Sequence, residues 1–124
     1  MVDPSGKGAV VRLSAEQRHE LARIAGELSS LARSGPALPG SIAERLTRCG
    51  RANCACHGDP PRRHGPYFQW TRKVAAKTVG RWLTPEQATD YRRWVDNDRK
   101  LRDLVGRLEA IGLEAVEADP RWER

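Results

Sequence analysis

The sequence contains little that is typical of a membrane, secreted or nucleotide-binding protein. Its 124 residues include no apolar run near the length of about 18 residues that a membrane span needs, and no N-terminal apolar segment long enough for a signal peptide. The three cysteines are an odd number, so a disulfide framework would leave one thiol unpaired. No G-x-x-x-x-G-K-[ST] phosphate loop is present. We therefore expect a cytoplasmic protein with no membrane contact, whose thiols stay reduced.

The residue patterns of common enzyme sites are also missing. No Cys-x-x-Cys redox pair occurs, and Cys54-Ala-Cys56-His57 is one residue shorter than the c-type haem motif. The acidic residues lie mainly in helix-like segments, at spacings typical of solvent-exposed ion pairs, rather than in the clusters of metal-dependent nucleases or transposases. We therefore expect no catalytic activity and no small-molecule substrate.

All three cysteines and two of the three histidines are concentrated in residues 49–67. Three thiolates and an imidazole make a closed tetrahedral set for Zn²⁺, and the candidate ligands are Cys49, Cys54, Cys56 and His64. Ordinary buried thiols are the alternative, but the neighbouring residues are mostly Gly, Pro and charged residues, which offer little core. The pattern predicts a structural zinc ion.

The fourth ligand is either His64 or His57. His57 directly follows Cys56, and adjacent side chains rarely reach one ion without strain. His64 comes after a Pro-Pro turn that could reverse the chain, so we prefer His64.

Positive charge is concentrated in the middle of the chain. Residues 45–93 contain eleven Lys and Arg against three acidic residues, a net charge of +8, whereas the whole chain has a net charge of +6. Such a concentration indicates a surface that binds a polyanion.

Capping residues and apolar periodicity predict an α+β fold. Ser14 with Gln17 is typical of a capping box, and Leu21, Ile24 and Leu28 belong to one apolar stripe, so we expect a helix over 14–34. A second capping-box pattern predicts a short helix from Ser41 to about Arg48.

The zinc-binding segment, 41–66, is expected to lead into a β-hairpin over 67–83. Thr84 with Gln87 is a third capping-box pattern, and Pro85 suits the first helical position, so we expect a long helix over 85–118, which Gly106 and Gly112 are expected to loosen. Residues 1–13 are expected to be disordered, 14–118 to form a single zinc-stabilised domain, and 119–124 to be a tail. The long helix is expected to pack back on the first helix, across a two-fold axis as a homodimer, or both.

The run Cys49-Gly50 … Cys54-x-Cys56 … His64-Gly-Pro-Tyr67 resembles the signature of an uncharacterised family of short bacterial and archaeal proteins. That family is marked by a C-G-x3-C-x-C … H-G-P-Y motif and by a downstream helix that begins just after a proline. The resemblance covers about residues 40–111, leaves the first helix outside, and supports His64 as the fourth ligand. It implies an association with mobile elements and with transposase or recombinase genes, and a role with nucleic acid.

These observations together favour a non-catalytic zinc protein that binds double-stranded DNA, regulatory or accessory to a mobile element or recombinase. The candidate phosphate-contacting residues are Arg51, Arg62, Arg63, Arg72, Lys73, Lys77, Arg81, Arg92 and Arg93. The hairpin aromatics are expected to be mostly core, although stacking on unpaired bases would suit a single-strand or RNA-binding module. A zinc-scaffolded adapter for protein interaction or oligomerisation is the other alternative.

Overall fold

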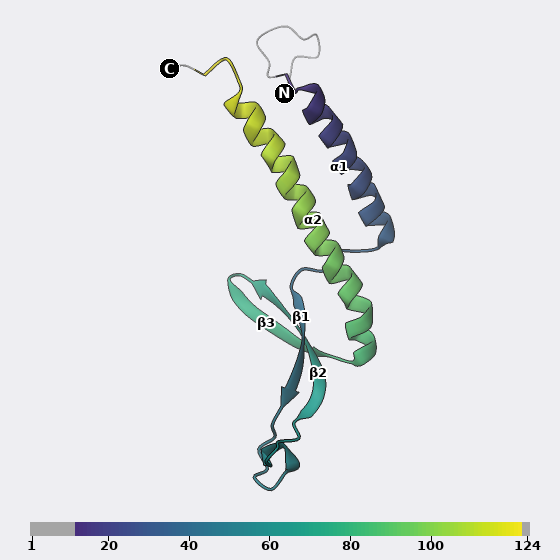
Figure 1. Cartoon of the computed structure of the whole chain (residues 1–124), viewed down its shortest axis with the longest axis vertical. Coiled ribbons are helices and arrows are strands. Elements are labelled where there is room, and N and C mark those ends of the chain that lie inside the picture. Colours follow the sequence, from purple (N-terminus) through teal and green to yellow (C-terminus); the bar gives the residue numbers. More distant parts are fainter. Residues whose placement is uncertain (1–11, 123–124) are drawn as a thin grey trace. The chain divides into compact units, whose positions relative to one another are not determined.

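The computed structural model describes residues 12–122 and has the α+β architecture expected from the sequence (Figure 1). In chain order its elements are α1 (Ala15–Ser34), β1 (Ser41–Thr47), the 3₁₀ turn η1 (Ala55–His57), β2 (His64–Val74), β3 (Lys77–Leu83) and α2 (Pro85–Glu117). The expected disorder of residues 1–13 falls almost wholly outside the described residues. Within residues 12–122, neither helix combines the length and apolarity that crossing a membrane requires.

The chain separates into two compact units that share α2. The helical unit contains the chain up to Ser34 and again from Lys100, and the sheet unit contains Gly35–Arg99. Whether residues 14–118 fold as one cooperative domain stays a prediction.

The helical unit is an antiparallel pair formed by α1 and the C-terminal part of α2 (Figure 1). Ile24, Leu104 and Ile111 form its buried core, and the leucines of the α1 stripe pack against them. Across the pair, Arg107 donates two hydrogen bonds of 3.1 Å to the carboxylate of Glu20. The predicted packing of the long helix on the first is confirmed.

Two of the three predicted capping boxes are formed. The backbone N–H of Gln17 donates to Ser14 Oγ at 3.0 Å, while the N–H of Ser14 donates to Gln17 Oε1 at 2.8 Å. Thr84 and Gln87 make the same reciprocal pair at 2.9 and 3.1 Å. α2 continues through Gly106 and Gly112, so the expected loosening there is wrong.

The predicted short helix over 41–48 is also wrong, because Ser41–Thr47 is the strand β1. β1 pairs antiparallel with the central strand β2, in a register that sets Ser41 opposite Thr71, and β2 pairs with β3 in the sheet order β1-β2-β3. Gly40 enters this strand at φ 107°, where any Cβ would collide with the carbonyl oxygen of Thr71. The inter-strand hydrogen bonds therefore override the local capping signal.

One face of the sheet packs on the first turns of α2. Ile42, Phe68, Trp70 and Leu83 are half-buried there, and Ala88 and Val95 of the helix are buried. The linker before β1 docks on the same helix, since the N–H of Leu38 donates to the Trp94 carbonyl at 2.9 Å. This packing leaves the loop between β1 and β2 at one end of the sheet, beyond the helix-covered face (Figure 1).

Candidate metal centre and nucleic-acid interface

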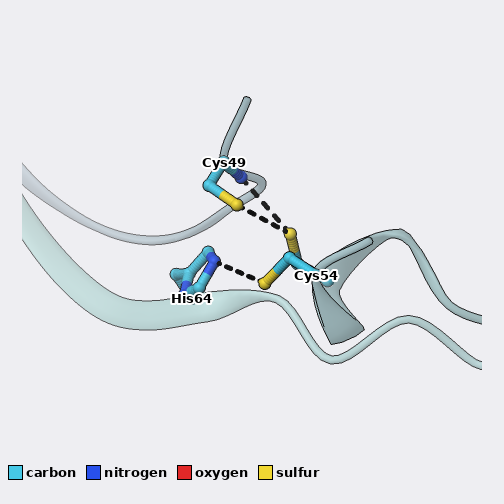
Figure 2. A group of neighbouring side chains, drawn as sticks. Cys49, Cys54 and His64 are labelled. Atoms are coloured by element: carbon cyan, nitrogen blue, oxygen red, sulfur yellow. Dashed lines mark hydrogen bonds between the residues drawn. The ribbon is translucent and has the colours of Figure 1, made fainter. Parts of the chain in front are cut away.

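The loop between β1 and β2 brings the four predicted metal ligands together. The sulfurs of Cys49, Cys54 and Cys56 and a ring nitrogen of His64 all lie within 4.8 Å of one another. Cys56 lies in the turn η1 and Cys54 immediately precedes that turn, whereas His64 is the first residue of β2. Figure 2 shows the side chains of Cys49, Cys54 and His64 pointing toward one another. The cluster is close enough to hold a metal ion.

The separations within the cluster suit a tetrahedral ion. Cys49 Sγ lies 3.6 Å from Cys56 Sγ, and Cys54 Sγ lies 3.4 Å from His64 Nε2. Zn–S bonds of about 2.3 Å in a tetrahedron would set two sulfurs about 3.8 Å apart. A disulfide needs about 2.05 Å between its sulfurs, and all three cysteines are free thiols. The donor set therefore fits a metal such as zinc and does not form a disulfide.

The surroundings of the thiols lower the pKa of Cys54 and raise the pKa of Cys56. A hydrogen bond from the backbone N–H of Cys56 is the largest cause lowering the pKa of Cys54, to about 6, and the neighbouring thiols of Cys56 and Cys49 add to it. Burial raises the pKa of Cys56. Cys54 is thus more ready than Cys56 to bind a cation near neutral pH.

His57 lies outside the cluster and holds the backbone beside it. Its Nε2 lies 2.6 Å from the carbonyl oxygen of Cys49, which can only accept, so Nε2–H is the donor. The N–H of Cys49 in turn donates to Cys56 Sγ at 3.3 Å. The structure therefore brings His64, rather than His57, to the three sulfurs.

Short-range hydrogen bonds and one glycine shape the loop. The N–H groups of Gly58 and Arg62 both donate to the carbonyl of Ala55, at 3.0 and 2.9 Å, and so close the turn. Gly65 follows the histidine at φ 119°, and a Cβ there would lie 2.8 Å from the carbonyl oxygen of Arg45. This is why glycine follows histidine in the His-Gly-Pro-Tyr run.

All nine residues predicted to contact phosphates are exposed, but they do not share one surface. Arg51, Arg62 and Arg63 lie on the loop between β1 and β2, residues 48–63, which we call the metal loop. Along the hairpin, successive side chains point to opposite faces, so Lys73 lies on one face and Arg72 on the other.

The helix-covered face holds its cations against aromatic rings. The guanidinium of Arg72 lies 5.2 Å from the ring centroid of Trp70, and that of Arg92 lies 5.4 Å from Phe68. Arg81 lines a hollow of about 440 Å³ beside Trp70 and Trp94. Lys77 occupies the same face by register, while Arg93 is exposed on α2.

The opposite face of the sheet, which we call the open face, was not predicted as a site. Alternation and register place on it Ser41, Ala43, Arg45, Tyr67, Gln69, Thr71, Lys73, Thr78, Gly80 and Trp82. Arg45 was missed because its segment was expected to be helical. The hairpin aromatics divide between the faces: Phe68 and Trp70 are half-buried as expected, whereas Tyr67 and Trp82 are 45% and 59% exposed.

Comparison with known proteins places this site in a family. No curated protein and no solved structure matches the chain. A family model matches residues 14–93, a stretch that includes α1, the metal cluster and the whole sheet. The first helix is therefore part of the family region, contrary to the extent expected from the motif. Because the match covers more than half of the sequence, the chain belongs to the family described as Domain of unknown function (DUF6788).

Proposed function

We propose that this protein is a non-catalytic zinc-containing module that binds double-stranded DNA. The observation that supports the proposal most is that the Cys₃His cluster lies inside the most basic segment of the chain. A structural ion held by Cys49, Cys54, Cys56 and His64 would fix the loop from which Arg51, Arg62 and Arg63 project. Phosphates would then meet a rigid cationic surface rather than a flexible one.

The donor set supports a structural rather than a catalytic role for the ion. Four protein ligands fill a tetrahedral zinc, whereas a catalytic zinc keeps one position open for water or substrate. The basic segment, with a net charge of +8, matches a polyanion better than a small neutral substrate. The resemblance noted from the sequence extends the proposal to a regulatory or accessory role beside a mobile element or a recombinase.

The test is a titration of labelled duplex DNA by fluorescence anisotropy at several salt concentrations. We expect the logarithm of the affinity to fall steeply with the logarithm of the salt concentration. The double variant Arg62→Ala/Arg63→Ala should lower this slope by about 2, at about 0.9 per phosphate contact, and keep its metal. Arg33→Ala/Lys100→Ala, which removes two exposed cations from the helices, is the matched control and should leave the slope unchanged. Absence of duplex binding at low salt would refute the proposal.

A second candidate, self-association through the helices, is favoured by the exposed apolar side chains of α2. Val105, Leu108, Leu113 and Val116 are between 36% and 68% exposed in the helical unit. A two-fold pairing of this surface would bury them. Sedimentation equilibrium tests it: a concentration-dependent dimer that Val105→Lys abolishes supports this role, and a monomer at high concentration refutes it.

A further inference from the structure

The open face presents only neutral and cationic groups. It carries Arg45 and Lys73, an amide, several hydroxyls and two exposed aromatic rings, and none of its ten residues is acidic. The acidic residue of the strand β1, Glu44, points to the other face. The charge of this face is therefore complementary to a polyanion.

A pair of side chains in the middle of the open face determines its hydrogen-bonding character. Arg45 Nε donates to Gln69 Oε1 at 3.0 Å, from β1 to the neighbouring strand β2. The amide nitrogen of Gln69 lies over Gly80, which has no side chain to displace it. The groups that this pair still offers a ligand are therefore mainly donors, the terminal nitrogens of Arg45 and the amide NH₂ of Gln69, beside one remaining lone pair on the amide oxygen.

A protein site that offers mainly hydrogen-bond donors prefers base edges that present acceptors. In the major groove guanine presents two acceptors, N7 and O6, whereas adenine presents an acceptor beside an N6–H₂ donor that needs an acceptor from the protein. Gln recognises adenine by turning both its amide oxygen and its NH₂ to the base edge, whereas the bond from Arg45 holds the oxygen of Gln69 toward β1. The pair is therefore matched to guanine.

The dimensions of the sheet suit the same groove. The major groove is about 12 Å wide and admits a two-stranded β-ribbon, and β1 and β2, which carry Arg45 and Gln69, are neighbouring strands about 4.8 Å apart. The rings of Tyr67 and Trp82 meet edge to face, with centroids 6.1 Å apart and planes at 71°. Two rings nearly perpendicular to each other cannot both stack on successive bases, so they fit apolar contact with thymine methyl groups or sugars better.

We propose that the open face binds in the major groove of duplex DNA and that Arg45 and Gln69 recognise guanine there. This inference rests on the proposed function, because it names the residues that would give a DNA-binding module its sequence preference. Lys73 and the arginines of the metal loop supply contacts without sequence information.

The experiment is a selection of zinc-loaded full-length protein on duplexes with a randomised central segment, followed by sequencing of the bound pool. The wild-type protein should enrich guanine at one or more positions. Arg45→Lys keeps the charge but loses the two-pronged donor, and should reduce that preference by between about 5-fold and 150-fold. Gln69→Ala should reduce it as well, and Arg33→Lys on α1 is the matched control. Zinc content and thermal melting verify that each variant is folded, and the exposed position of Arg45 makes its variant the decisive one.

The outcomes separate this inference from the proposed function. Duplex binding without any base preference, or a preference that survives Arg45→Lys, overturns the inference and leaves the proposed function standing. Absence of all nucleic-acid binding overturns both. Tighter binding to single strands, lost in Trp82→Ala but kept in Arg45→Lys, also overturns the inference and would assign the face to stacking on unpaired bases.

Discussion

Removal of the proposed zinc ion is expected to unfold the loop between β1 and β2 locally. The loop runs from Arg48 to Arg63, sixteen residues with no regular structure apart from η1. Within this loop, all of which the structure describes, Cys56 is the one buried side chain. The loop therefore has almost no core of its own.

The free energy that the ion must supply to order the loop follows from the contacts of the loop. Ordering the backbone costs at least about 1 kcal/mol per residue, so about 16 kcal/mol for the loop. Six hydrogen bonds made by the loop residues Cys49, Cys54, His57, Gly58 and Arg62 contribute about 1 kcal/mol each. Burial of the Cys56 side chain contributes about 1 kcal/mol more. The deficit of about 9 kcal/mol is close to the low end of the range of about 10–16 kcal/mol that structural zinc supplies.

Trypsin offers a direct assay, because the loop contains four arginines as cleavage sites, Arg48, Arg51, Arg62 and Arg63. Zinc-loaded protein should resist cleavage at these sites, whereas chelated protein and Cys54→Ser should be cut there at least about tenfold faster. Elemental analysis should find one zinc per chain in the wild type and none in Cys54→Ser.

The two neighbouring histidines provide a matched pair of controls. His64→Ala should lose the metal, and His57→Ala should keep it, since the ring of His57 holds the Cys49 carbonyl and not the ion. A Cys54→Ser protein that keeps its zinc, or a chelated loop that still resists trypsin, would refute the reasoning.

Three further predictions concern the scaffold. Ala75 and Ala76 form the β2–β3 turn at φ 50° and 67°, a left-handed conformation that is unfavourable for alanine. The double variant Ala75→Asn/Ala76→Gly should therefore raise the free energy of unfolding by about 1–2 kcal/mol, and a lower urea midpoint would contradict this. Ile24→Ala should cost about 2–5 kcal/mol in the helical unit and leave the zinc content unchanged; loss of zinc would contradict the division into two units. A hydrogen bond from Arg107 lowers the pKa of Glu20 below its ordinary value near 4.5. The stability that the Glu20–Arg107 ion pair contributes is therefore present above that pH and is lost as the pH falls through the lowered pKa. Urea unfolding at pH 7 and pH 3 should therefore show a larger penalty for Arg107→Gln at pH 7, and an equal penalty at both would contradict the ion pair.

Much of the helical architecture could be predicted because its signals are local. The capping pairs Ser14–Gln17 and Thr84–Gln87 join residues three apart, and the structure contains both. Ser41 and Glu44 have the same pattern, yet β1 is a strand. The difference lies in a partner thirty residues away, since Ser41 pairs with Thr71 across the sheet. A local pattern contains no information about that partner.

Residue types and short spacings were enough to predict the donor set of the Cys₃His cluster, the two helix starts and the concentration of positive charge around the cluster. These properties depend on residue type and short spacing, which the folded chain does not alter. The folded chain was needed to establish that His64 rather than His57 meets the sulfurs, that Arg45 lies beside Gln69, and that the hairpin cations are divided between two faces. Strand register decides such questions, because a shift of one residue moves every side chain to the other face of the sheet.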